Sequence, residues 1–174
     1  MNMQIYAADR IERVRADWAG QRPDLDTSPM EVIGRILRAE HLAGARIRRV
    51  LRAEGLDRGG FDVLATLRRS GPPYRLTPTR LYQELVLTSG AITHRVDALA
   101  RAGLVERVSG GRDRRSTLVG LTDEGRAVAD RAMAANLACE AAMIGALADA
   151  DRETLAALLK KLLDGLEAEE AEVR

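Results

Sequence analysis

Apolar residues recur every three or four positions along most of the chain, and this spacing predicts a mainly helical protein. The first helix is expected from Ile5 to Ala19, with Trp18 on its apolar side. A long helix should follow from Ser28 to Gly55, because its Ser-Pro-x-Glu start has the form of a capping box with proline at the first helical position. A further helix is expected from Asp57 to Gly71, and two more after residue 122.

Between residues 76 and 124 the pattern predicts two short helices, a strand, a polar tip and a second strand. Thr77 and Thr88 are suited to cap the two helices, because a threonine hydroxyl accepts a hydrogen bond from a free backbone N–H of the first turn. Gly103 is expected to end the second helix, since glycine adopts the left-handed conformation without a steric cost. One face of the second helix is apolar and is expected to be buried, at Ile92, Val96 and Leu99.

Segments 104–108 and 116–121 are short and rich in apolar or β-branched residues, and they predict a β-hairpin. Residues 101–115 hold five Arg against one Glu and one Asp, a net charge of +3, whereas the whole chain carries +1. A basic hairpin tip suits contact with DNA phosphates or a minor groove. A solvated tip without a partner is the ordinary alternative.

This order of elements predicts a winged helix-turn-helix, a mainly α-helical fold with a small β-hairpin wing. The second helix of such a fold enters the major groove of DNA, and small polar residues in its first turns allow its backbone to approach closely. The predicted base-facing residues are Thr88, Ser89, Gly90, Ala91, Thr93 and His94. The predicted wing contacts with DNA are Arg112, Arg114 and Arg115.

Two motifs resemble the DNA-binding core of the MarR family of bacterial transcription regulators. They are the Arg-Asp-x-Arg motif of residues 112–115 and the Leu-Thr-x-x-Gly motif of residues 121–125. The resemblance implies a regulator that binds a double-stranded DNA operator, with Asp113 as a wing-stabilising residue. The family's wing motif usually opens with Asp, and Gly110 stands there in this chain, which removes one internal ion pair.

The extra N-terminal helix resembles the urate-responsive branch of the same family. At the positions that mark this branch, the chain has Trp18, Asp62, Arg95 and Arg107. The resemblance implies that these residues bind a ligand, and a planar purine anion would suit an aromatic wall, two guanidinium groups and a carboxylate. Taken singly, each residue also has an ordinary explanation in core packing, a helix first turn or a phosphate contact. A ligand that drew both arginines towards Asp62 would displace the DNA-reading elements and lower DNA affinity.

The leucines of the last helix, from Leu155 to Leu166, form a stripe wider than one short contact requires. Together with the N-terminal helices they predict a homodimer, with a monomer core as the alternative. A two-fold dimer would bind a pseudo-palindromic operator with half-sites about 10 bp apart. The expected segments are an extra helix and loop at 1–27, dimerisation and core helices at 28–73, the winged helix-turn-helix at 74–121, and C-terminal dimerisation helices at 122–174.

Composition excludes several classes of function. Cys139 is the only cysteine, and His41 and His94 are the only histidines, so neither a metal cluster nor a Cys/His nucleophile is apparent. The chain is therefore expected not to be an enzyme and to need no metal or cofactor. No apolar run approaches the length of a membrane span, and a cytoplasmic location is expected.

The predicted function is a ligand-responsive regulator, acting as a repressor that urate or a related purine releases from its operator. Three alternatives stay open: the same kind of regulator with a phenolic ligand, an oxidant sensor acting through Cys139, and an effector-independent DNA-binding protein. The second is disfavoured, because no basic residue lies within a helical turn of Cys139 to activate its thiol.

Overall fold

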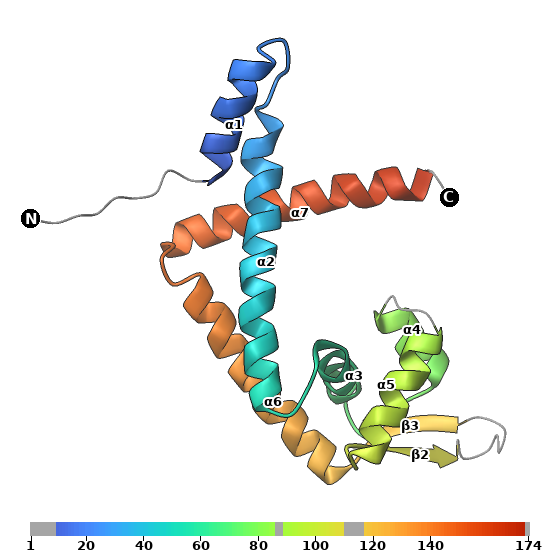
Figure 1. Cartoon of the computed structure of the whole chain (residues 1–174). Coiled ribbons are helices and arrows are strands. Elements are labelled where there is room, and N and C mark those ends of the chain that lie inside the picture. The colour runs from blue at the N-terminus through green and yellow to red at the C-terminus, as the bar shows by residue number, and fades with distance from the viewer. Residues whose placement is uncertain (1–9, 86–88, 110–116, 173–174) are drawn as a thin grey trace, which may run out of the picture. The chain divides into compact units, whose positions relative to one another are not determined.

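The computed structural model describes residues 10–85, 89–109 and 117–172. The chain divides into two compact units, residues 1–49 and 50–174. Figure 1 traces the elements in chain order, and they are mainly helices with a small antiparallel sheet. The predicted fold class is confirmed.

The first unit is a helical hairpin. Helix α1 spans Arg10–Gln21, and helix α2 spans Pro29–Ala53, of which the residues up to 49 belong to this unit. The two helices approach closely at Gly34, where an added Cβ would lie 2.9 Å from Cδ1 of Ile11. The absence of a side chain at Gly34 therefore allows Ile11 to pack against the α2 backbone.

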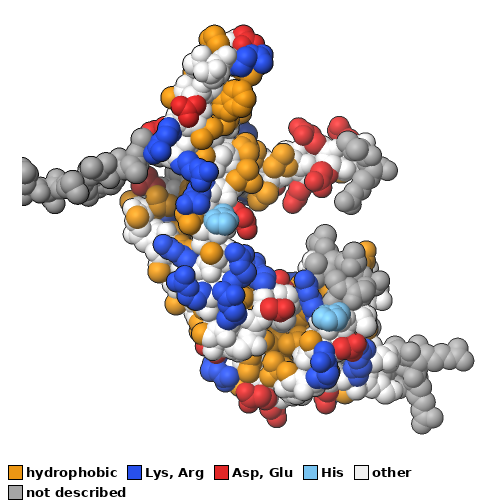
Figure 2. Space-filling view, viewed as in Figure 1, with side chains coloured by type: hydrophobic (Ala, Val, Ile, Leu, Met, Phe, Trp, Pro, Cys, Tyr) orange, Lys and Arg blue, Asp and Glu red, His pale blue; other side chains and the backbone are white. Residues whose placement is uncertain are grey.

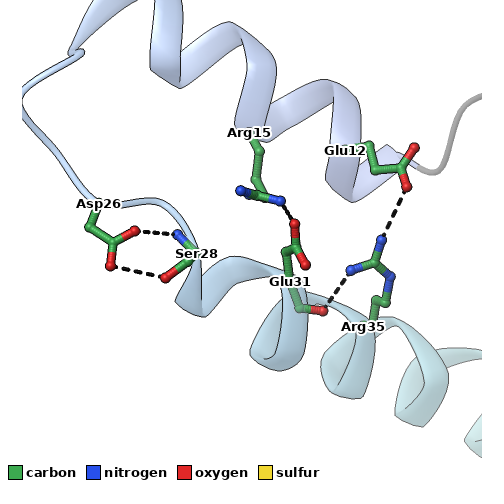
Figure 3. A network of polar contacts seen from close by, with 6 residues as sticks. All are labelled: Glu12, Arg15, Asp26, Ser28, Glu31 and Arg35. Atoms are coloured by element: carbon green, nitrogen blue, oxygen red, sulfur yellow. Dashed lines mark hydrogen bonds and ion pairs between the residues drawn. The ribbon is translucent and has the colours of Figure 1, made fainter.

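Ion pairs join the same two helices (Figure 3). Arg15 of α1 pairs with Glu31 of α2, and Nη2 of Arg35 lies 3.5 Å from Oε1 of Glu12. Arg35 also donates from Nη1 to the backbone oxygen of Glu31, at 2.9 Å. The predicted extra helix thus has specific polar contacts with α2 as well as apolar ones.

The start of α2 is held differently from the predicted capping box. Helix α2 begins at Pro29 as expected, but the Ser28 hydroxyl donates to Oδ2 of Asp26 at 2.9 Å. The backbone N–H of Ser28 donates to the other carboxylate oxygen, at 2.8 Å, and these two bonds lower the pKa of Asp26. Glu31, the expected capping partner, is instead paired with Arg15, because a guanidinium is a stronger partner for a carboxylate than a peptide N–H.

The second unit contains the winged-helix elements and the two C-terminal helices. Helices and strands follow in the predicted order, apart from one additional short strand. Their bounds are α3 Arg58–Arg69, β1 Arg75–Leu76, α4 Pro78–Leu85, α5 Ser89–Arg101, β2 Val105–Ser109, β3 Thr117–Leu121, α6 Asp123–Met143 and α7 Asp149–Glu172.

Local signals that were visible in the sequence set several of these bounds. Asp57 caps α3 by accepting a hydrogen bond from the N–H of Gly60 at 2.6 Å. Thr122 caps α6 by accepting from the N–H of Gly125 at 2.9 Å, and its hydroxyl donates to the backbone oxygen of Gly103 at 2.8 Å. Gly103 itself has a φ of +72°, as expected for the residue that ends α5.

The sheet has three strands in the order β1-β3-β2, with both pairs antiparallel. Strand β1 was not predicted, because two residues are too short to show an alternating pattern. The hairpin strands begin and end within one residue of the predicted bounds. In the register of β2 with β3, Val105 lies opposite Leu121 and Arg107 opposite Val119.

The core of the second unit lies between α3, α4, α5, α6 and the sheet. Its fully buried side chains include Leu64, Leu67, Leu81, Val96 and Val119. The stripe predicted for α5 is buried as expected, since Ile92, Val96 and Leu99 are at most 5% exposed. Burial of these apolar surfaces fixes which side of α5 faces outward.

Helix α7 has no buried residue, and five of its leucines are more than a third exposed. They are Leu155, Leu158, Leu159, Leu163 and Leu166. Figure 2 shows acidic side chains gathered towards the C-terminal end of this helix. In the part of the chain that the structure describes, no helix is long and apolar enough to span a membrane.

Candidate nucleic-acid interface and ligand site

Helices α4 and α5 pack against each other through buried side chains, among them Leu81 and Ile92. Thr77 caps α4 by accepting from the N–H of Arg80 at 3.1 Å. With one side of α5 buried, Thr93 and His94 are left exposed on the outward side. This is the arrangement in which the second helix of a helix-turn-helix presents its first turns to DNA.

The predicted DNA-contacting residues fall into three groups. Thr93 and His94 are exposed on α5, and the backbone of Ser89, Gly90 and Ala91 forms its start. The remaining predicted DNA contacts lie outside the described part of the chain: Thr88, Arg112, Arg114 and Arg115. The predicted wing-stabilising residue Asp113 also lies outside it.

The structure adds an exposed aromatic residue to this surface. Tyr82 of α4 is 45% exposed and lines a groove of about 270 Å³ together with Pro78, Thr79, Ile92 and Thr93. Its ring therefore lies beside a predicted base-facing residue of α5. The sequence offered one signal for Tyr82, a large aromatic on the polar side of a short amphipathic helix, and our prediction did not use it.

Ion pairs hold the hairpin strand β2 on both of its faces. Nη2 of Arg107 lies 2.6 Å from Oδ1 of Asp97 on α5. On the other face, Nη2 of Arg75 lies 3.3 Å from Oε1 of Glu106, and the Arg75 side chain crosses Gly120 of the central strand to reach it. The pairing of Arg107 with Asp97 could not be read from the sequence, because it depends on where the strand lies against the helix.

Arg95 extends from α5 onto the first turn of α3. Its guanidinium lies over Gly59, where any Cβ would overlap it. It also lines a groove of about 310 Å³ whose walls include the buried residues Leu56 and Leu99 and the exposed His94. Figure 2 shows hydrophobic side chains at this part of the surface with charged ones around them. An arginine at the edge of an apolar groove is a typical arrangement for binding a small organic anion.

Asp62 lies three residues after Gly59 and therefore on the same side of α3. Its carboxylate is 34% exposed and pairs with Arg58, whose Nε is 3.3 Å from Oδ1. Arg95 thus lies against the side of α3 that also carries Asp62, one helical turn further on, although Asp62 does not line the groove. The structure holds Arg107 elsewhere, because Asp97 is two residues after Arg95 and so projects about 200° around the helix from it.

The fourth predicted ligand residue, Trp18, belongs to the first unit. Its side chain is 48% exposed on α1. An indole ring half open to solvent is available to contact a flat molecule and to report on it by fluorescence. Among the described residues, no group of His, Cys, Asp and Glu is arranged to hold a metal ion.

The helix pair α4 and α5, the hairpin strands and the capped helix α6 define a DNA-binding protein of the winged helix-turn-helix class. Residues 54–116 match the model of the MarR family. The chain is 35% identical over 152 residues to the HTH-type transcriptional regulator PecS of Dickeya dadantii. The match covers 87% of this chain and 92% of that protein. The chain belongs to the MarR family and is a transcriptional regulator, not an enzyme.

Two further comparisons agree with this assignment. The HTH-type transcriptional regulator PrsX of Escherichia coli is 30% identical over 131 residues, 75% of this chain and 78% of that protein. A solved structure of a mutant MarR from Escherichia coli, complexed with operator DNA, is 26% identical with a TM-score of 0.66, and the match covers 80% of this chain and 99% of that one.

Proposed function

We propose that this regulator is a repressor that binds its operator as a homodimer and is released by urate or a related purine anion. The observation that carries the ligand proposal is the position of Arg95, which belongs to the DNA-reading helix and yet lies over α3 at the edge of an apolar groove. A ligand bound to Arg95 would therefore bear directly on the helix that contacts DNA.

The proposed complex places the start of α5 in the major groove. Its support is the exposure of Thr93 and His94 and the MarR structure with operator DNA. The five exposed leucines of α7 support the homodimer, because an apolar stripe of that length is usually covered by a partner. A two-fold dimer would contact half-sites about 10 bp apart.

Footprinting of the regulator's own upstream region at moderate salt tests this arrangement. We expect two protected half-sites of related sequence, with centres about one helical turn apart. Protection of a single half-site, or uniform protection without sequence preference, would contradict the dimeric operator complex. Uniform protection that weakens steeply with salt is the result expected of an effector-independent DNA binder.

The proposed ligand residues of the second unit are Asp62, Arg95 and Arg107, and Trp18 of the first unit stays a ligand residue that the resemblance to the urate-responsive branch implies. A guanidinium would bind the ligand's oxyanion or carbonyl oxygens, a carboxylate would accept its ring N–H groups, and an indole would stack on its plane. A ligand that binds the DNA-incompetent arrangement better by ~1–3 kcal/mol would reduce operator affinity by roughly 5- to 150-fold. The proposal requires only such a difference in affinity, whichever arrangement forms first.

Titration of the operator complex with urate tests the ligand proposal. We expect urate to weaken operator binding by roughly 5- to 150-fold and to change the fluorescence of Trp18, the only tryptophan. Arg95→Gln should retain operator binding and lose most of the response. Gly59→Ala should act in the same direction, because the new methyl group would displace the Arg95 guanidinium.

The matched control is Arg101→Gln, which removes the same charge from an exposed position of α5 without touching the groove. This variant should respond to urate as the native protein does. If saturating urate left the native operator complex intact, urate would be excluded as the effector. Xanthine and a phenolic acid, titrated in the same way, would then distinguish another purine from the phenolic alternative.

A further inference from the structure

The ion pair of Arg107 with Asp97 joins the two elements that a winged helix presents to DNA. Asp97 lies in α5, the proposed recognition helix, and Arg107 lies in β2, the strand that leads to the wing. Nη2 of Arg107 is 2.6 Å from Oδ1 of Asp97, and the two side chains are 41% and 53% exposed. The short distance at this exposure identifies a specific contact between helix and strand.

Side-chain alternation along β2 explains why Arg107 and not its neighbours reaches the helix. Val105 and Arg107 point to the same face of the sheet, and Val105 is 3% exposed on that face. Glu106 points to the opposite face, where it pairs with Arg75. The tight turn at Gly103 then places the inward side of β2 next to the last turns of α5.

The position of Asp97 gives this pair a role in DNA binding. Asp97 follows Thr93 by four residues, so both side chains project from the same side of α5. A carboxylate on the DNA-facing side of a recognition helix would repel the phosphate backbone if it were unpaired. The guanidinium of Arg107 removes this repulsion and ties β2 to the helix through the same contact.

We propose that Asp97 and Arg107 form a positioning pair for DNA binding, in which Arg107 acts chiefly by neutralising Asp97. Exposed ion pairs add little to folding stability, so the effect should appear in operator affinity and not in the melting temperature. The inference rests on the proposed operator complex and extends it to Asp97, a residue with no predicted role. The pair would also couple ligand binding to DNA binding. A ligand that bound the Arg107 guanidinium would leave Asp97 unpaired beside the DNA.

Three variants test the inference in operator-binding assays at fixed salt. Arg107→Gln leaves Asp97 unpaired and should weaken operator binding about tenfold. Adding Asp97→Asn to it should restore most of that affinity, because the repelling carboxylate is then gone. The matched control, Arg75→Gln, removes an equal charge from the same sheet and leaves Glu106 unpaired on the other face, and it should change affinity by less than about twofold.

Two results would overturn the inference. If the double variant bound the operator as weakly as Arg107→Gln alone, Arg107 would act by touching DNA itself and not through Asp97. If Arg75→Gln lost as much affinity as Arg107→Gln, the loss would reflect total charge and not this pair. Failure of the native protein to bind any operator would instead contradict the proposed function, so the two failures are distinguishable.

Discussion

Replacing Gly125 with alanine is expected to destabilise the second unit by about 3 kcal/mol or more, because the new methyl group has no space to occupy. Gly125 lies in the first turn of α6, where a Cβ would overlap the backbone oxygen of Leu104. That oxygen also accepts a hydrogen bond from the N–H of Thr122 at 3.2 Å. Because the obstacle is backbone held by a neighbouring hydrogen bond, it cannot rotate away as a side chain would.

Thermal and urea unfolding of Gly125→Ala measure this effect. The control is Gly20→Ala, at an exposed position near the end of α1 where a Cβ would meet nothing within 4 Å. Alanine favours a helix over glycine, so this variant should change stability by less than about 1 kcal/mol, towards greater stability. Equal melting temperatures for Gly125→Ala and the native protein would show that α6 and the turn after α5 are less closely packed than described.

A charge on the exposed stripe of α7 is expected to abolish the dimer and, with it, most operator binding. Leu158 is 61% exposed, so Leu158→Glu should leave the folded chain intact while placing an unpaired carboxylate in the proposed interface. A monomer would then bind one half-site and would lose the additional affinity that a dimer obtains by binding two half-sites at once. We expect operator affinity to fall on the order of 100-fold or more.

Light scattering and operator binding, measured on the same samples, test this expectation. Ala157→Glu is the control, because Ala157 is also exposed on α7 but projects about 100° or more around the helix from each of the five exposed leucines. It should retain the native mass and affinity. A Leu158→Glu protein that kept the dimer mass would place the interface on other residues, and a native protein that was monomeric would contradict the dimer altogether.

Many features of the DNA-binding region could be predicted because they depend on neighbours in the sequence. Asp and Thr are residue types that favour the position before a helix, and Asp57 and Thr122 cap α3 and α6 in the structure. The buried stripe of α5 follows from helical spacing alone, and the outward side follows from the stripe. The capping box at Ser28 failed for the converse reason, since a side chain from another helix took its glutamate.

The candidate ligand site could be predicted only in part. The residue types at Asp62, Arg95 and Arg107 indicated an anion site, but spacing could not show their partners. The structure places Arg95 over Gly59 and pairs Asp62 with Arg58 and Arg107 with Asp97. Each of these contacts depends on how separate elements pack against each other. The residue pattern along a single element does not show which other element will lie beside it.

The amino-acid sequence by itself determined the order of the elements, most of their ends and the buried side of helix α5. Periodicity, capping and glycine conformation depend on residues close together in the sequence. The elements that they set can therefore be predicted without knowledge of the tertiary structure. Only the tertiary structure decided that a strand arginine pairs with Asp97, that Arg95 lies over a glycine, and that Gly125 lies against the carbonyl of Leu104. These contacts join residues from separate elements, whose distance is set by the packing of the whole core.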